Sequence, residues 1–468
     1  MLSKFKYTPI ILIFGSILLY WLFAYNLTRT EYIKLLLLYS ALFYSFYTIV
    51  KRFKGNLKLL TYFSFGFRAI FILAIPNLSQ DFYRFIWDGR MILEGFNPYL
   101  YTVESFISQG EFPVVQAKEL REGMGGLNAS HFTNYPPINQ LYFVVAGLFA
   151  GKSILGSAIV LRLLIIAADL GTLHFGKKLL EKLKIPSHNI FWYILNPFII
   201  IELTGNLHFE GVMIFFLIWS LYLLSCGKWQ WAGVILALSI SVKLIPLIFM
   251  PLFFQWFTNT DDKMQKQIQH DKKFKLFFNK TGKLILFYAI TLGTTTLLFL
   301  PFYSSEFINN YSQTVALWFQ NFEFNGSIYY IAREIGYSFR GYNEIAIIGK
   351  IIPLIVIAFT LVLTFFRRNK SMKALITAML LVLSFYYFTT TTVHPWYVAS
   401  LLILSVFTKY KFPLVWSFVI ILSYLAYINL NKADKSENLW IITFEYLLVY
   451  MVFFWEVFFK SKFGFKAY

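Results

Sequence analysis

The stretch 79-SQDFYRFIWDGRMILEGFNPYL-100 gathers four charged residues within ten positions, Asp81, Arg84, Asp88 and Arg90, directly after a long apolar run. The chain as a whole is far less charged: 58% of its 468 residues are hydrophobic and only 14% carry charge. A soluble domain is typically about a quarter charged. The meaning of this stretch therefore depends on where it lies relative to a membrane.

Apolar runs of about 17–25 residues, the length that a helix needs to cross a bilayer, recur along the whole chain. They predict an all-α, polytopic membrane protein with about 12–14 transmembrane helices, forming one integral-membrane domain over residues 1–468. The first run has no small-residue cleavage site and is expected to be a retained span rather than a signal peptide. Spans are expected near residues 7–27, 33–50, 59–77, 157–176, 189–205, 211–226, 229–243, 245–257, 284–301, 343–366, 374–392, 396–408, 412–430 and 439–459.

Lys and Arg gather in short clusters between the expected spans, as in residues 51–58, 177–184 and 367–373. Cytoplasmic loops carry an excess of these residues, so both termini are expected in the cytoplasm. The net charge of +19 then reports topology and not a nucleic-acid surface, because the basic residues form no single patch. Two large loops, 78–156 and 302–342, are expected to face outward and to carry juxtamembrane helices.

One short apolar segment, residues 138–151 after Tyr135-Pro136-Pro137, decides how many times the chain crosses. With only about fourteen residues it is short for a span. If it did cross, the basic cluster 177–184 would lie outside. We therefore expect it to lie in the membrane interface, as a helix of the first outer loop.

A short helix is expected from Asp81 to just before Gly95, with Ser79 as its N-cap. Asp81, Arg84 and Asp88 would then share one face of the helix. Two interpretations stay open. The charges form exposed ion pairs of an amphipathic helix, which contribute little energy, or they present two carboxylates and an arginine for chemistry at the membrane surface.

The order of motifs supports the second interpretation. An Asp past an early span in "DFYRFIWDGRMILEGFNPY" (81–99), then Asp-Gly-Arg, Gly-Phe-Asn-Pro-Tyr and Tyr-Pro-Pro, resembles the GT-C superfamily of integral-membrane glycosyltransferases, which use polyprenyl-phosphate sugars. Residues 79–140 are most similar to bacterial polyprenol-phosphate-mannose-dependent mannosyltransferases. Weaker similarity at "NLHFEG", "SVKLIPLIFMPL" and "HPWY" extends it over most of the chain.

The resemblance implies that Asp81 is the catalytic base and that the chain lies in a bacterial cytoplasmic membrane, with its active site outside. The family's paired acidic signature is reduced here to Gln80-Asp81. This departure weakens the case for a bound metal; a divalent cation stays open and no cofactor is expected. The single Cys226 excludes a Cys-based metal site.

Besides a base, the reaction needs positive groups to stabilise the departing phosphate. Lys243 can meet a lipid phosphate, or it merely snorkels to the interface. His208 and Glu210 contact substrate or belong to a solvated loop tip. The residues expected to bind substrate are Arg84, Asp88, Arg90, Tyr135, His208, Glu210, Lys243, Arg340, His394 and Tyr397.

The expected function is an inverting glycosyltransferase that moves a sugar, with mannose the favoured one, from a polyprenyl-phosphate donor to a glycan or lipid-linked acceptor at the outer membrane face. The alternative is a transporter or flippase of polyprenyl-linked glycans. Such proteins place functional charges near the midplane and often contain inverted repeats. No repeat is visible and the polar residues concentrate at one face, which favours the enzyme. Its expected partners are the bilayer, the lipid-linked sugar and the acceptor, not nucleic acid.

Overall fold

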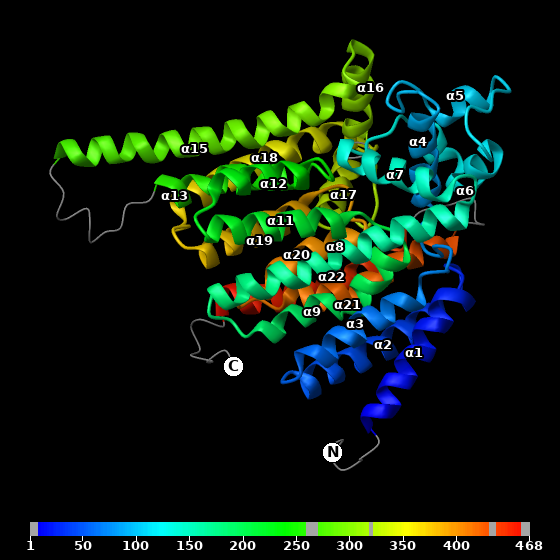
Figure 1. Cartoon of the computed structure of the whole chain (residues 1–468), viewed down its shortest axis with the longest axis horizontal. Coiled ribbons are helices and arrows are strands. Elements are labelled where there is room, and N and C mark those ends of the chain that lie inside the picture. Colours follow the sequence, from blue (N-terminus) through cyan, green and yellow to red (C-terminus); the bar gives the residue numbers. More distant parts are fainter. Residues whose placement is uncertain (1–7, 259–269, 318–321, 430–436, 460–468) are drawn as a thin grey trace.

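The computed structural model of the chain describes residues 8–258, 270–317, 322–429 and 437–459. In these ranges the regular structure is helical, and the exception is an isolated β-bridge between Phe324 and Thr392. Most of the long helices run side by side across the molecule (Figure 1). The predicted all-α fold of a polytopic membrane protein is confirmed.

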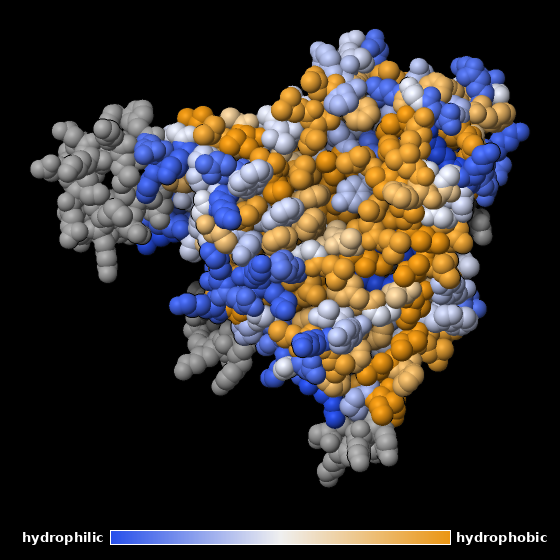
Figure 2. Space-filling view, in the orientation of Figure 1, coloured by the Kyte–Doolittle hydropathy of each residue, from blue (hydrophilic) through white to orange (hydrophobic). Residues whose placement is uncertain are grey.

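Seven of the described helical segments are long and apolar enough to cross a membrane, and an eighth is added if one bent pair counts as a single span. Figure 2 shows a broad apolar surface over the middle of the bundle, with hydrophilic residues gathered toward its two ends. The seven spans belong to α1 (Thr8–Asn26), α2 (Tyr32–Phe53), α8 (Ile154–Lys182), α15 (His270–Phe299), α18 (Ile345–Phe366), α19 (Met372–Thr389) and α22 (Leu439–Phe454).

Several other expected spans are short or broken helices. For this reason fewer than twelve of the described helices are long enough to cross a membrane on their own. Shorter apolar helices cover residues 137–150, 229–240, 245–258, 395–406 and 412–426. Two of the long spans continue into η5 (Leu300–Phe302) and η9 (Trp455–Phe459). The other elements outside the two loops are α3 (Leu57–Ile70), η2 (Ser187–Ile190), α9 (Phe191–Ile194), α10 (Pro197–Ile199), η3 (Ile200–Gly205), α11 (Glu210–Ser225), α12 (Trp229–Ile240), η4 (Ile245–Leu252), α13 (Phe253–Thr258), η7 (Pro395–Tyr397), α20 (Val398–Val406), α21 (Phe412–Val419) and η8 (Ile420–Asn429).

The bent pair joins Pro197–Gly205 to α11 at an angle of 114°. A break in a helix inside the bundle of a membrane protein frees carbonyl groups, which then need new hydrogen-bond donors. The buried Arg162 of α8 supplies them, since its guanidinium donates to the carbonyls of Thr204 at 2.9 Å and Gly205 at 3.0 Å. The break is therefore built into the fold, and it places residues 206–209 at the start of α11.

A second buried arginine ties α3 to α8. Arg68 Nε donates to Asp169 Oδ2 at 2.7 Å, and both side chains are completely buried. The same guanidinium donates to the carbonyl of Ile194 at 2.7 Å. Because removing one partner would leave an unpaired buried charge, this pair fixes how the N-terminal helices sit on the bundle.

The first large loop folds into α4 (Asp81–Leu93), α5 (Val103–Ile107), α6 (Ala117–Ala129) and α7 (Pro137–Ala150), which lie at one end of the bundle, at the right in Figure 1. The expected helix from Asp81 is confirmed, and it ends before Gly95, which has the positive φ of 84° that glycine adopts readily. The expected N-cap is wrong: Gln80 holds that position without a side-chain cap. Ser79 Oγ instead accepts from the backbone N–H of Asp81, at 3.3 Å.

The second loop carries α16 (Ser305–Ala316) and α17 (Ile328–Arg340). It meets the first loop at the Asn-Pro-Tyr turn, where Asn97 Nδ2 donates to the carbonyl of Phe302 and Asn310 Nδ2 to that of Tyr99, both at 3.1 Å. Tyr99 also donates its hydroxyl to the carbonyl of Tyr135 at 2.6 Å. The motif at 95–99 therefore joins both loops to the start of α7. That α7 lies in the membrane interface stays a prediction, since no membrane is part of the structure.

Candidate active site

Helix α4 lies unusually close to α7, and the glycine of Asp-Gly-Arg makes this possible. A Cβ at Gly89 would lie 2.2 Å from the carbonyl oxygen of Phe143. The ring of Phe85 stacks on that of Phe143, with centroids 4.7 Å apart and planes at 6°. The motif thus encodes helix packing at residue 89 as well as charge on either side of it.

Arg84 and Asp88 form a buried ion pair inside the loop rather than an exposed one. Arg84 Nε donates to Asp88 Oδ1 at 2.7 Å. The same guanidinium donates to the carbonyls of Asn128 at 3.0 Å and His131 at 2.8 Å. Gln140 Nε2 of α7 approaches the other Asp88 oxygen at 3.2 Å. The interpretation as solvent-exposed pairs is wrong, and these contacts make the pair a brace between α4, α6 and α7.

Arg90 lies away from Asp81. It is about two and a half turns further along α4, which turns it to the opposite face of the helix. Its Nη1 donates to the carbonyl of Val115 at 2.6 Å and approaches Gln116 Oε1 at 3.3 Å. The structure therefore places Arg90 against the segment before α6 and not beside the catalytic candidate.

Asp81 itself is partly buried at the start of α4, where its Oδ1 accepts from Asn128 Nδ2 at 3.3 Å. Burial raises the pKa of this carboxyl, and the nearby negative charge of Glu210 raises it further. The positive charge of Lys243 and the Asn128 hydrogen bond oppose that rise. A carboxylate whose pKa lies above its ordinary value is better matched to proton abstraction near neutral pH.

A small cavity of about 70 Å³ is lined in part by Lys243 and Glu210, the two residues whose charges act on this carboxyl. Within it, Lys243 Nζ lies 3.0 Å from Glu210 Oε1 and 5.5 Å from the ring centre of Tyr135. The other oxygen of Glu210 is buried and has no hydrogen-bond partner. The cavity is lined by Asn134, Tyr135, Pro136, Glu210, Met213, Lys243, Leu244, Ile245, Val315, Tyr386, Tyr387, Tyr397 and Ser400.

The position of Lys243 is set by the start of α7. The backbone N–H of Ile138 donates to the carbonyl of Ser241 at 3.0 Å, and Asn139 Nδ2 donates to that of Val242 at 2.8 Å. Pro137 begins α7, a place where the missing N–H costs nothing. The Tyr-Pro-Pro motif thus connects α4, through its close contact with α7, to the lysine that enters the cavity.

His208 and His394 lie on the two faces of one indole ring. His208 stacks on Trp396 with ring centres 3.6 Å apart, and His394 stacks on the other side at 4.6 Å. Burial and the charge of Lys243 lower the pKa of His394 to about 3 and hold that of His208 well below its usual range. Both rings are therefore neutral, so the 3.8 Å approach of His208 to Glu202 is no charged pair. In this form His394 offers a hydrogen bond but no charge to a phosphate.

Arg340 is not among the residues that line the cavity. It lies at the end of α17, its side chain is 64% exposed, and its Nε is 3.5 Å from Glu344 Oε1. Of the sequence candidates, the structure brings Tyr135, Glu210, Lys243 and Tyr397 into the cavity wall. Asp81 does not line the cavity, but the charges of Lys243 and Glu210, which do, act on its carboxyl.

Sequence reasoning missed several residues of the candidate site. Asn128, which donates to the catalytic candidate, stands in a stretch without any motif. Tyr386, Tyr387 and Ser400 lie on apolar helices. A tyrosine near the end of a span is typical of the membrane interface, so nothing local marks these as functional. Among the described residues no group of three His, Cys, Asp or Glu is placed to hold a metal ion, and we derive no step through one.

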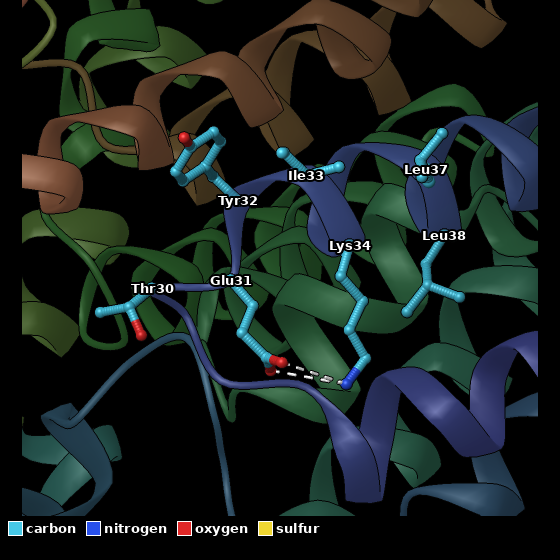
Figure 3. Close-up of a pocket in the computed structure, with 7 residues that line it drawn as sticks. All are labelled: Thr30, Glu31, Tyr32, Ile33, Lys34, Leu37 and Leu38. Atoms are coloured by element: carbon cyan, nitrogen blue, oxygen red, sulfur yellow. Dashed lines mark hydrogen bonds and ion pairs between the residues drawn. The ribbon is translucent and has the colours of Figure 1, made fainter.

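A second hollow, of about 470 Å³, lies at the start of α2 (Figure 3). Glu31 and Lys34 point toward each other there, 3.4 Å apart, while Tyr32 and Ile33 turn to the opposite side. Its two charged side chains are thus already paired, and its wall holds none of the candidate residues. It is an open surface feature rather than a second reaction site.

Two similarities bear on this arrangement. Residues 13–259, just over half of the chain, match the family described as alpha-(1->6)-mannopyranosyltransferase, N-terminal domain. The chain is also similar to Alpha-(1->6)-mannopyranosyltransferase A of Corynebacterium glutamicum, with 27% identity over 190 residues, which cover 40% of this chain and 36% of that protein. The aligned part thus spans little more than a third of that relative. The family match includes Asp81, Glu210 and Lys243 and ends before His394 and Tyr397.

Proposed function

Because the chain belongs to the alpha-(1->6)-mannopyranosyltransferase family, we propose that it transfers mannose from a polyprenyl-phosphate donor to a glycan or lipid-linked acceptor. The observation that carries the proposal is the cavity itself. A carboxyl with a raised pKa lies within electrostatic reach of a lysine, at one end of an apolar helical bundle. A donor with a lipid tail and an anionic head needs both surroundings.

The proposed reaction gives each of these residues one role. Asp81 accepts the proton of the acceptor hydroxyl, and the oxygen attacks C1 of the sugar. The bond between C1 and the phosphate oxygen breaks, the phosphate leaves with the electron pair, and the configuration at C1 inverts. Lys243 exchanges its contact with Glu210 for the phosphate, whose growing negative charge it stabilises. The freed Glu210 then accepts a hydrogen bond from a hydroxyl of the bound sugar.

The outer membrane face is the proposed location of this chemistry. The basic clusters lie at the turn between α2 and α3, at the end of α8 and between α18 and α19, at the end of the bundle opposite α4–α7 (Figure 1). Since such clusters stay in the cytoplasm, the site is expected outside. Cysteines tested one at a time at the exposed positions Ser108 and Lys54, in a Cys226→Ser background, separate the alternatives. Ser108→Cys should react with an impermeant thiol reagent in intact cells and Lys54→Cys only after permeabilisation; the reverse pattern overturns the orientation.

Transfer is tested directly with purified protein in detergent. We expect labelled polyprenyl-phosphate-mannose to lose its sugar to at least one member of a panel of glycan and glycolipid acceptors. Parallel reactions with polyprenyl-phosphate-glucose and -arabinose test the sugar. Absence of transfer from every donor, combined with movement of the lipid across vesicle membranes, would replace the enzyme with a transporter.

A further inference from the structure

Asn325, in the segment 322–327 between α16 and α17, has an unusual environment for a loop residue. It is completely buried, and its φ of +49° lies in the left-handed region that asparagine tolerates better than most residues. A buried loop residue in this conformation persists only when its surroundings hold it there.

The C-terminal part of the chain holds Asn325 from three directions. Both carboxylate oxygens of Glu437 accept from its backbone N–H at 3.0 Å. Its Nδ2 donates to Glu445 Oε1 at 3.1 Å, and its carbonyl accepts from the hydroxyl of Tyr446 at 2.8 Å. Glu445 is held in turn by the indole N–H of Trp416, at 3.1 Å. One residue of the second loop is thus fastened to α22 and the segment before it.

The opposite side of the same segment is paired with the chain that leads to His394. The backbone N–H of Phe324 donates to the carbonyl of Thr391 at 3.2 Å, and the N–H of Val393 donates back to the carbonyl of Phe324 at 2.8 Å. Thr392 Oγ1 donates to the carbonyl of Phe322 at 2.6 Å. The Phe324 ring then stacks on His394, with centres 5.1 Å apart and planes at 28°.

We propose that Asn325 is a positioning residue of the active site. Through its hydrogen bonds to α22 it fixes the segment 322–327, which holds His394 and Trp396 in their ring stack with His208 beside the cavity. The role in transfer rests on the proposed function, whereas the anchoring does not. Asn325 and the residues of α22 that it contacts lie outside the region of the family match, residues 13–259. The second half of the chain therefore sets the geometry around a lysine that belongs to the first half.

A thiol accessibility measurement tests the anchoring without any sugar transfer. Thr391 is completely buried, so in the Cys226→Ser background a Thr391→Cys reporter should label slowly with a water-soluble maleimide. Asn325→Gly keeps the left-handed backbone but removes the bond to Glu445, and it should raise the labelling rate severalfold, up to about tenfold, the loss of roughly one hydrogen bond. Tyr446→Phe, which removes only one hydroxyl, should act in the same direction. The matched control Asn309→Ala, on the exposed face of α16, should leave the rate unchanged.

A double-mutant cycle tests the link to the site, in the Cys226→Ser background with Thr391 intact. If Asn325 acts through His394, the Asn325→Gly/His394→Gln protein should have a kcat/KM within about twofold of His394→Gln alone, because coupled residues are not additive. Unchanged labelling in both Asn325→Gly and Tyr446→Phe would overturn the anchoring. Faster labelling, combined with a loss of kcat/KM in the double mutant that equals the product of the two single-mutant losses, would overturn the positioning role. A wild type without transfer would refute the proposed function and, with it, the role in transfer, while the labelling result would still decide the anchoring.

Discussion

Replacing Asp81 by Asn changes the proposed base while leaving its surroundings almost intact. The two side chains have nearly the same shape, and the amide oxygen of Asn can still accept from Asn128 Nδ2, which now lies 3.3 Å from Asp81 Oδ1. Asp81 has no part in the buried pair of Arg84 with Asp88 that braces α4. The substitution therefore removes one chemical property, the ability to take a proton.

The size of the effect follows from that property. A positioned general base contributes about 10²–10⁴-fold to rate, which corresponds to roughly 2.7–5.4 kcal/mol of barrier at about 1.36 kcal/mol for each tenfold change. The same substitution should leave the thermal stability of the fold unchanged or raise it. Because the folded-state pKa of Asp81 is raised above its ordinary value of 3.8, the ionised form destabilises the fold. Its contribution to stability is full below the ordinary pKa and is lost as the pH rises through the raised one. At neutral pH Asp81→Asn should thus unfold at the same temperature as the wild type or higher.

The assay compares initial rates of mannose transfer with thermal unfolding of the same preparations. Asp81→Asn should lose at least 100-fold in kcat and still bind the donor. The pH profile adds a signed test, since transfer requires the ionised carboxylate and should fail below the raised pKa. Lys243→Ala removes the charge that lowers the pKa of Asp81, so the acid limb of the profile should move to higher pH. Full activity of Asp81→Asn, or an acid limb that moves to lower pH in Lys243→Ala, would refute the assignment of the base.

Substitutions at Lys243, Asp88 and Gly89 separate chemistry from packing. Lys243→Ala should lower kcat/KM for the donor by about 10–100-fold, the worth of a hydrogen bond to a charged group, and Lys243→Arg should lose less; equal losses would mean that charge is not what the site requires. Asp88→Asn should cost about 3 kcal/mol of stability because it strips the buried Arg84 of its counter-ion, yet leave the transfer rate of each folded molecule close to normal; a kinetic loss without a thermal one would give Asp88 a chemical role. Gly89→Ala should lower the unfolding temperature, since the added Cβ would meet the Phe143 carbonyl and overpacking costs about 1–3 kcal/mol, whereas Gly66→Ala, which has open space around it, should not.

Much of the candidate site was predictable because it depends on local sequence. The helix that begins at Asp81 follows from the periodicity of its charges and from Gly95, which ends it. The cavity residues Tyr135, Glu210, Lys243 and Tyr397 stand in or next to motifs that the resemblance singles out. Arg340 was predicted from its charge and Arg90 from its place in the Asp-Gly-Arg motif, but neither lines the cavity. A charge pattern specifies a helix face but not which neighbour that face will meet.

By itself the amino-acid sequence determined the class of this protein, because a chain that is 58% hydrophobic, with its basic residues in short clusters, can bury its helices only in a bilayer. It also singled out Asp81 as the catalytic candidate, through the resemblance that its motif carries. Only the tertiary structure decided that Arg84 and Asp88 face inward, that α7 holds the lysine, and that Asn325 joins α22 to the ring stack. The physical reason is distance along the chain: Asn325 and Glu445 are 120 residues apart, and their contact depends on the packing of helices between them that no local pattern records.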